Sequence, residues 1–307
     1  MKITAAICTY NREKYLPQVL NSIACQTLAA DQYEIIVVDN NSPGNTQEIV
    51  EQFQRNNPSI SCSYFLETKQ GLSFARNKAI EKAKFEIITF VDDDAFLKED
   101  YLAILVAQFK ADTQIAAIGG KILLHFETIV PNWENKYLNS LLGYYNPSEK
   151  EFTYARNGKN SDYPRGSNMT IHKKVFDKIG VFNVELGRVG GNLLGGEEKD
   201  IFYRIYNEPG FKVNYIPNAI VYHCVPIERT TKAFIIRQAI GTGHSERIRA
   251  QKEKTYLTSL AKEIYKSIGS IVLFFLYLIH NQFTKGKMIL IFRIHVFKGL
   301  LNISKLN

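Results

Sequence analysis

The chain has 307 residues, of which 45% are hydrophobic, so it can bury a full core as one large domain or one domain with an extension. Its four cysteines are scattered and form no CxxC pair, which argues against a zinc site or disulfide framework and favours a reducing cytosol. The net charge of +8 is uneven, because residues 228–307 hold 14 Lys and Arg against 4 Asp and Glu. This asymmetry indicates that the C-terminal quarter has its own partner.

The first 115 residues alternate between strand and helix patterns, starting directly at the N-terminus, where no signal peptide is expected. Short apolar runs predict strands at 3–8, 34–39, 60–67 and 87–91. Amphipathic periodicity predicts helices at 16–23, 46–54, 73–84 and 99–110, the third with Ser73 as N-cap. Continuous apolar strands between such helices predict an α/β fold with a mostly parallel sheet covered on both faces.

The second part of the chain is more mixed. We expect a strand at 116–124, a loop leading into a strand at 164–172, a helix at 195–206, and one or two strands at 211–223. From about residue 229 the pattern becomes helical and basic. This change predicts an α/β domain over residues 1–227 and a helical extension over 228–307.

The extension contains two unusual helical segments. Residues 268–279 form an apolar run of 12 residues, whereas a spanning helix needs roughly 20. Residues 287–301 mix bulky apolar side chains with basic ones. Such basic amphipathic helices often lie on anionic membrane surfaces, so we expect contact with one through 228–307. The alternative is that both helices pack on the main domain or on a second subunit.

Polar clusters follow three of the predicted strands, at 8–12 (CTYNR), 39–41 (DNN) and 92–94 (DDD). In open α/β sheets, ligands bind outside the carboxyl ends of the strands. Asp92 and Asp94 have D-x-D spacing, which suits a hard divalent cation such as Mg²⁺ or Mn²⁺ with substrate phosphates. Alone, this spacing is weak evidence, since acidic loops are usually just solvated.

The order of several motifs is more specific. ITAAICTYNREKYLPQVLNSIACQT, YEIIVVDNNSPGNT, KQGLSFARNKAIEKAKFEIITFVDDDAF and the later GGEEKDIFYR resemble the nucleotide-sugar glycosyltransferases of family 2, which have the GT-A fold. The resemblance covers about residues 1 to 225. It implies a transferase that uses a nucleotide sugar and a divalent cation.

By this resemblance, the turn of Thr9, Tyr10, Asn11 and Arg12 holds the nucleotide, and Asp39 hydrogen-bonds the base edge. Two structural alternatives stay open. Tyr10 could be a packing aromatic, and Asp39 could cap the turn that follows it.

The resemblance also assigns roles around the third cluster. Gly71 and Arg76 match a G-x-x-x-A-R-N segment, in which the guanidinium would contact the diphosphate or the base. Asp92 would meet the ribose, Asp94 would bind the metal, and Asp93 would point away or support the site. An exposed helical arginine is the alternative for Arg76.

The remaining site residues come from the second part of the chain. The family's base follows G-E, which places it at Glu198, although many relatives have Asp there; Glu197 is a secondary candidate. Both could instead only stabilise the helix dipole, by about 0.3–1 kcal/mol each. Gly166 and Asn168 would lie near the donor, and His223 would complete the metal site or be a structural histidine.

The expected reaction is inverting transfer of a sugar, with a lean toward UDP as carrier, to a saccharide or lipid-linked saccharide in surface polysaccharide or glycan synthesis. We expect a cytoplasmic protein at the inner membrane face. A sugar-phosphate nucleotidyltransferase is disfavoured because CTYNREKY lacks glycine. A non-catalytic membrane-surface binding protein on the same scaffold is a further alternative. No nucleic-acid role is expected, because the basic residues alternate with long apolar runs.

Overall fold

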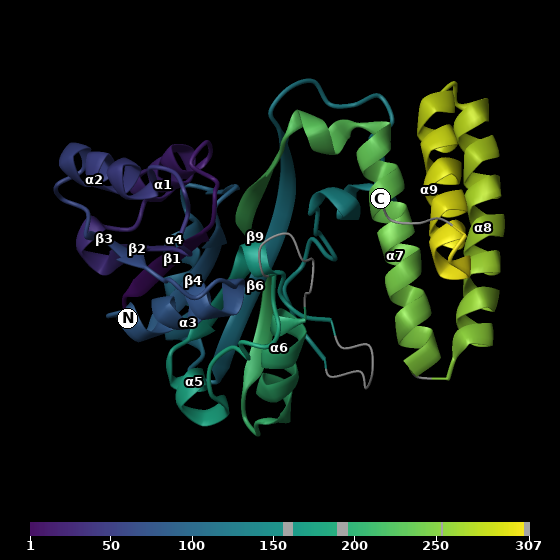
Figure 1. The fold of residues 1–307 in the computed structure, drawn as a ribbon. Coiled ribbons are helices and arrows are strands. Elements are labelled where there is room, and N and C mark those ends of the chain that lie inside the picture. The colour runs from purple at the N-terminus through teal and green to yellow at the C-terminus, as the bar shows by residue number, and fades with distance from the viewer. Residues whose placement is uncertain (156–161, 189–195, 253, 304–307) are drawn as a thin grey trace. The chain divides into compact units, whose positions relative to one another are not determined.

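The structure is a computed structural model that describes residues 1–155, 162–188, 196–252 and 254–303. The chain forms two compact units (Figure 1). The first consists of Met1–Leu123 and Tyr145–His223, and the second of Leu124–Tyr144 and Cys224–Asn307.

Four parallel strands form one half of the sheet in the first unit. They are β1 (Ile3–Thr9), β2 (Tyr33–Asp39), β3 (Cys62–Leu66) and β4 (Ile87–Asp92), in the spatial order β3-β2-β1-β4. All four were predicted from apolar runs. The parallel order follows because each strand is connected to the next by a helix, as parallel strands require.

These helices cover both faces of the parallel strands (Figure 1). They are α1 (Leu16–Ala24), α2 (Thr46–Asn56), α3 (Leu72–Lys82) and, after β4, α4 (Tyr101–Ala111). Ile3, Ala5 and Ile7 of β1 pack in one core with α1, α2 and α4, whereas Ala6 packs in a second core with α3. The prediction of a sheet buried on both faces is therefore confirmed.

The prediction that Ser73 caps α3 is wrong. The helix begins at Leu72 with Gly71 as its N-cap residue, so Ser73 lies inside the first turn. Its hydroxyl donates instead to the carbonyl oxygen of Leu186 at 2.7 Å. The hydroxyl thus donates to a distant loop, whereas an N-cap serine would accept from a backbone amide of the helix.

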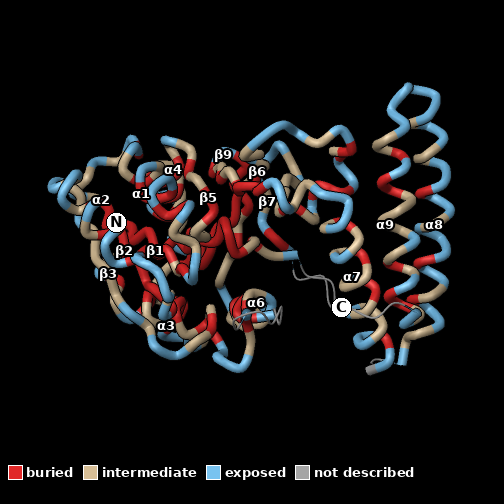
Figure 2. Tube along the Cα trace, turned by 45° about the horizontal axis from the view of Figure 1, so that its top comes forward, coloured by how far each residue is buried: buried red, intermediate tan, exposed pale blue. Residues whose placement is uncertain are grey.

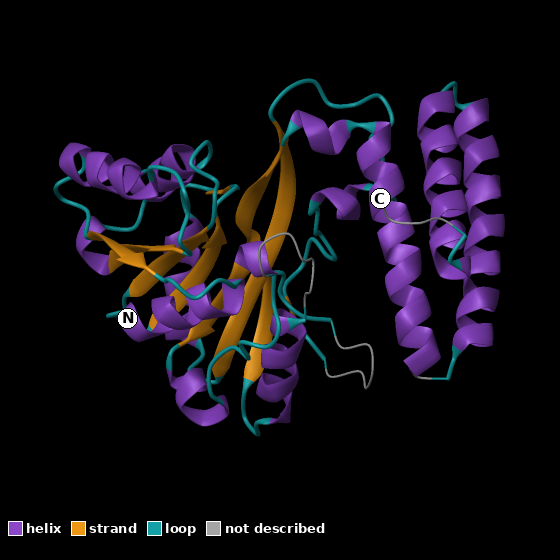
Figure 3. Cartoon of the chain, viewed as in Figure 1, coloured by secondary structure: helices purple, strands orange, loops and turns teal. Residues whose placement is uncertain are grey.

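The later strands extend the sheet in antiparallel fashion (Figure 3). They are β5 (Ala95–Leu97), β6 (Ile115–Phe126), β7 (Phe152–Thr153), β8 (Met169–His172) and β9 (Lys212–Val225). β8 pairs with β4 and β6, while β5 and β7 pair with β9. The predicted region 211–223 therefore forms a single strand. Helices α5 (Lys174–Ile179) and α6 (Glu197–Asn207) pack in the same core as α3.

The second unit is dominated by three long helices, α7 (Lys232–Lys252), α8 (Tyr256–Ile279) and α9 (Phe283–Leu301). α9 packs against both α7 and α8, and it buries Met288, Ile289 and Val296. The predicted segment 287–301 is therefore a packed helix, and its partners are the other two helices of the extension. Within the described residues, no helix is both long and apolar enough to cross a membrane.

Close packing of α7 and α9 depends on glycine. A side-chain carbon added at Gly243 of α7 would collide with the backbone carbonyl of Val296 in α9. Because the obstacle is backbone, no rotamer change can make room for it. Gly241 lies on the same helix, and nothing in the described chain lies within 4 Å of a carbon added there.

This contrast predicts opposite effects of two alanine substitutions. Gly243→Ala should lower the free energy of unfolding by about 1–3 kcal/mol through overpacking. Gly241→Ala should be neutral or stabilising by up to about 1 kcal/mol, because alanine favours a helix. Urea unfolding followed by circular dichroism measures both, and equal stability of the two variants would contradict the close packing.

Candidate active site

The carboxyl ends of the parallel strands bring the three polar clusters together. In the register of the sheet, Thr9 lies beside Asp39 on one side, and Cys8 lies beside Asp92 on the other. The prediction that these clusters share one edge of the sheet therefore agrees with the strand pairing. The site is built at this edge.

The turn after β1 connects the clusters through its backbone. The Tyr10 amide donates to Asp93 at 3.4 Å, and the Asn11 amide donates to the Ser42 hydroxyl at 3.0 Å. The Tyr10 side chain is 42% exposed, so it is not a core-packing aromatic. Arg12 extends toward Asp94, with a guanidinium nitrogen 3.7 Å from a carboxylate oxygen.

Asp39 is buried and caps its own turn, as one of the two sequence interpretations held. One carboxylate oxygen accepts from the Ser42 amide at 2.9 Å, and the other accepts from the Tyr64 hydroxyl at 2.9 Å. Each oxygen has a second lone pair, so these bonds leave Asp39 able to accept from a ligand. Nearby, the amide of Gly71 donates to the Asn40 side chain at 2.7 Å, which links the β2 turn to the start of α3.

The short ladder between β5 and β9 places His223 beside Asp94. Ala95, the first residue of β5, pairs with His223, and this pairing brings the preceding residue, Asp94, beside the imidazole. The Nε2 atom of His223 lies 3.5 Å from a carboxylate oxygen of Asp94, and both side chains are buried. The Nδ1 atom of His223 is buried without a hydrogen-bond partner in the described part of the chain.

This pair fits a small divalent cation. Two ligands at roughly 2.1 Å from one ion, at about a right angle, lie about 3 Å apart, close to the observed separation. No group of three His, Cys, Asp or Glu side chains that could hold a metal occurs among the described residues. A cation at Asp94 and His223 would therefore take its other ligands from water and phosphate oxygens, as Mg²⁺ commonly does.

Asp92 and Asp93 complete the acidic cluster. Burial, reinforced by the negative charge of Asp94, raises the pKa of Asp93 to about 7. The same two causes raise the pKa of Asp92, although the positive charge of Arg76 opposes them. Both carboxyl groups therefore hold their protons more tightly than free aspartates do.

Arg76 is the centre of the second acidic group. Its side chain is only 2% exposed, and its guanidinium lies 3.1 Å from Glu197 and 3.5 Å from Glu198. The rings of Phe90 and Phe182 flank it, with centroids 5.9 and 5.4 Å from the guanidinium carbon. The interpretation of Arg76 as an exposed helical arginine is wrong, because α3 turns this side chain into the interior.

Gly166 makes room for this arrangement. It lies in a short 3₁₀ turn (Gly166–Asn168), and a side-chain carbon there would collide with the carboxylate of Glu198. The Gly166 amide also hydrogen-bonds Glu198. In the same turn, Asn168 donates to the carbonyls of Lys121 and Ala219 and accepts from Tyr101. The Asn168 amide is thus occupied by protein groups, and it fixes the turn that carries Gly166.

The two glutamates have different surroundings. The Glu198 side chain is 23% exposed, whereas that of Glu197 is 6% exposed. Burial raises the pKa of Glu198, Arg76 lowers it, and the charges of Glu197 and Asp92 raise it. Glu198 is therefore the glutamate that combines access from outside with an enhanced tendency to bind a proton.

Electrostatic coupling joins the two acidic groups into one site. Asp92 feels the charge of Asp94 on one side, and its own charge acts on Glu198 on the other. Arg76 interacts with Asp92 as well as with both glutamates. The end of β4 and the start of α6 thus lie close enough to interact electrostatically. Sequence reasoning missed Tyr64, Ser42 and Tyr101, whose hydroxyl groups have no motif of their own.

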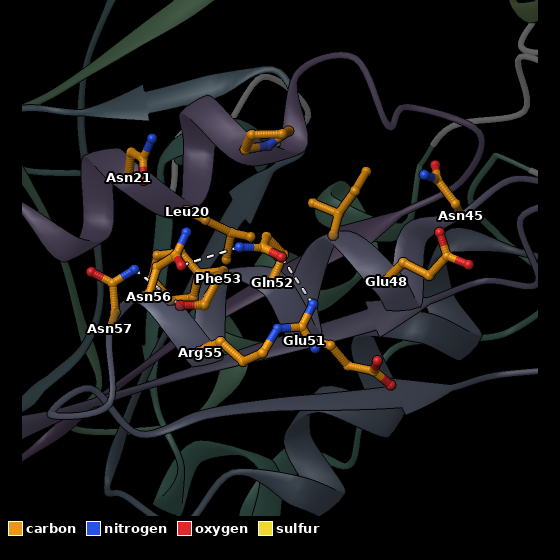
Figure 4. Close-up of a pocket in the computed structure, with 12 residues that line it drawn as sticks. Leu20, Asn21, Asn45, Glu48, Glu51, Gln52, Phe53, Arg55, Asn56 and Asn57 are labelled. Atoms are coloured by element: carbon orange, nitrogen blue, oxygen red, sulfur yellow. Dashed lines mark hydrogen bonds between the residues drawn. The ribbon is translucent and has the colours of Figure 1, made fainter.

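A separate hollow of about 780 Å³ lies beside α1 and α2 (Figure 4). Some of its polar lining residues hydrogen-bond one another, as in the pairs Gln52–Asn56 and Arg55–Gln52. None of the predicted site residues lines it. It is therefore distinct from the acidic site at the strand ends.

Known proteins of similar sequence and structure show which family the chain belongs to. A glucosyl-dolichyl phosphate glucuronosyltransferase of Haloferax volcanii is 24% identical over 255 residues, which cover 81% of this chain and 77% of that protein. A mannosyltransferase of Pyrobaculum calidifontis, solved with GDP-Man and Mn²⁺, has a TM-score of 0.60 at 18% identity over 99% of this chain and 88% of its own.

A structure of S. aureus TarS 1–349 with UDP has a TM-score of 0.52 at 17% identity, over 100% of this chain and 93% of that one. These likenesses show the GT-A fold. The sequence profile described as Glycosyl transferase family 2 matches residues 4–180, more than half of the chain. The protein therefore belongs to glycosyl transferase family 2 and is a glycosyltransferase.

Proposed function

We propose that the protein moves a sugar from a nucleoside-diphosphate sugar, most simply a UDP-sugar, to an acceptor hydroxyl, with inversion at the anomeric carbon. The observation that carries this proposal is that Asp92, which interacts with Asp94, also interacts with Glu198, which Arg76 binds at 3.5 Å. The UDP in the TarS structure and the GDP-Man in the Pyrobaculum structure support a nucleotide-sugar donor.

The acceptor proposed here is a saccharide or lipid-linked saccharide in polysaccharide or glycan synthesis. Its support is the similarity to the glucosyl-dolichyl phosphate glucuronosyltransferase, whose name describes such an acceptor. We assign transfer to residues 1–227 and a supporting role to the helices of 228–307.

Donor binding is assigned to the strand ends. Asp39 and the turn from Thr9 to Arg12 would hold the nucleoside, since Tyr10 is exposed there and Asp39 keeps lone pairs to accept from a base. Asp92 would meet the ribose. The Arg12 guanidinium, 35% exposed and beside Asp94, is placed to bind a diphosphate oxygen.

Asp94 and His223 would hold a divalent cation, Mn²⁺ or Mg²⁺, with Mn²⁺ present in the Pyrobaculum structure. When bound, such an ion stabilises the negative charge that develops on the departing diphosphate. Arg12 adds a positive charge on the same side of the site. Asp94, His223 and Arg12 would thus all lie beside the departing diphosphate.

Glu198 is assigned as the general base. It takes the proton from the acceptor hydroxyl, whose oxygen attacks the anomeric carbon as the bond to the nucleoside diphosphate breaks. Arg76 is a positioning residue, because its buried guanidinium fixes the carboxylates of Glu198 and Glu197 and limits the rise in the pKa of Glu198. Its contacts in the structure are with these glutamates, whereas sequence reasoning assigned it to the diphosphate or the base.

The two glutamates should respond differently to substitution. Glu198→Gln should lower kcat by about 10²–10⁴-fold, because it removes the base. Glu197→Gln should retain far more activity, since Glu197 is enclosed and acts through Arg76. Release of nucleoside diphosphate in the presence of acceptor measures both, and a smaller loss in Glu198→Gln than in Glu197→Gln would reverse the assignment.

The pH dependence supplies a second test with a defined sign. Glu198 must be deprotonated to act, so kcat/KM should rise with pH through its pKa, which lies above the ordinary value of a glutamate. Glu197 raises that pKa by its charge, so Glu197→Gln should move the acidic limb of the profile to lower pH. An unmoved limb would show that the titrating group is not Glu198.

Metal dependence tests the role of Asp94. Chelation with EDTA should abolish transfer, and added Mn²⁺ or Mg²⁺ should restore it in the parent protein. Asp94→Asn should weaken Mn²⁺-dependent binding of UDP, measured by calorimetry, because one charged oxygen ligand is lost. The exposed Asp31→Asn is the matched control. Full activity in EDTA would exclude the proposed cation.

The donor is identified by a panel of UDP-, GDP- and dTDP-sugars, scored by protection from thermal unfolding and by diphosphate release. Nuclear magnetic resonance of the product gives the anomeric configuration, and retention would contradict the single displacement. Formation of a nucleotide sugar from UTP and a sugar 1-phosphate would instead identify a nucleotidyltransferase.

A further inference from the structure

The helix α8 buries three polar side chains and leaves most of its large apolar side chains exposed. Its fully buried side chains are those of Ser259, Glu263 and Ser270. Its exposed large apolar side chains are Leu257, Ile264, Tyr265, Ile268, Ile271, Val272, Phe275, Leu276, Leu278 and Ile279. Leu273 and Tyr277 of α8 pack against the core of the second unit, yet the opposite side of the helix is apolar too, where a helix facing water normally carries polar residues. Figure 2 shows the exposed surface continuing along most of α8.

The exposed apolar residues form one continuous face. At 3.6 residues per turn, they fall within about 160° of the helix circumference and extend over about 33 Å of its length. The charged side chains of α8, Lys262, Glu263 and Lys266, all fall outside this arc. We call this surface, made of the ten apolar residues above, the α8 face.

A buried charge pair fixes the orientation of the α8 face. Glu263 is 4% exposed, and its carboxylate lies 2.6 Å from Arg293 of α9 and 2.6 Å from Lys266. Rotating α8 to bury its apolar side would expose or unpair these groups. Removing one partner of a buried pair is strongly destabilising, so the pair holds the apolar side of α8 outward.

We propose that the α8 face docks on an anionic lipid surface. Apolar burial supplies part of the binding, and the basic side chains beside the face supply attraction to the headgroups. The charge of the segment selects this occupant, because residues 228–307 carry a net +10. A second copy of the chain would bring two such segments together with like charges, whereas anionic headgroups complement them. This proposal does not depend on the identity of the donor.

The test compares three full-length proteins in vesicle flotation. The first is the parent, the second carries Ile268→Asp and Phe275→Asp on the α8 face, and the third carries Ile129→Asp and Val130→Asp. Ile129 and Val130 are 87% and 52% exposed and lie outside α8, so the third protein controls for loss of exposed apolar residues elsewhere. Vesicles are phosphatidylcholine alone or mixed with phosphatidylglycerol.

The parent and the control should float with the mixed vesicles, and the α8 variant should bind at least about tenfold more weakly. Binding of the parent to phosphatidylcholine alone should be weaker, because the headgroup attraction is lost. Equal flotation of all three proteins, or none by the parent, overturns the proposal. Self-association of the parent without lipid, abolished in the α8 variant, would assign the face to a second copy.

Two further measurements separate this outcome from the transferase proposal. Urea unfolding checks that the α8 variant is folded. Release of nucleoside diphosphate from a soluble donor should match that of the parent, because the α8 face lies outside the residues assigned to transfer. If the α8 variant loses flotation but keeps turnover, the docking proposal is supported whatever the result for the active site. If Glu198→Gln loses turnover, that result bears only on the transferase proposal.

Discussion

The buried guanidinium of Arg76 is the constraint on which the active site depends. It joins α3 to the start of α6 across 121 residues of sequence. A buried cation is costly unless it is paired, and the loss of one partner typically costs about 3–5 kcal/mol. Glu197 and Glu198 must therefore be present at the start of α6, and Gly166 must lack a side chain for Glu198 to fit. The pairing that stabilises the buried guanidinium of Arg76 thus also fixes the position of the Glu198 carboxylate.

The other side of the site depends on strand pairing. β5 has only three residues, yet its antiparallel pairing with β9 places His223 next to Asp94. The parallel strands supply Asp39 and Asp92 from the opposite direction along the sheet. Residues from the two ends of the first unit's sequence therefore come together around Asp94.

Sequence reasoning was effective where short-range patterns decide the structure. The strands that end at Asp39 and Asp92 have continuous apolar runs, and parallel topology puts their ends at one edge. It was ineffective where a side chain chooses between near and distant partners. Ser73 has the pattern of an N-cap but binds a loop carbonyl 113 residues away. Arg76 has the pattern of a surface helix residue, because periodicity does not reveal that two glutamates elsewhere compensate its charge.

A buried charge pair between two helices also occurs in the second unit, where it has a different consequence. Glu263 and Arg293 form a buried pair between α8 and α9, as Arg76 and Glu197 do between α3 and α6. In both cases the pair sets the rotation of a helix about its axis, because any other rotation would leave a charge buried without a partner. At α6 this rotation places Glu198, the proposed base, beside Arg76. At α8 it turns an apolar face outward, so the helix keeps a surface that water alone would not favour.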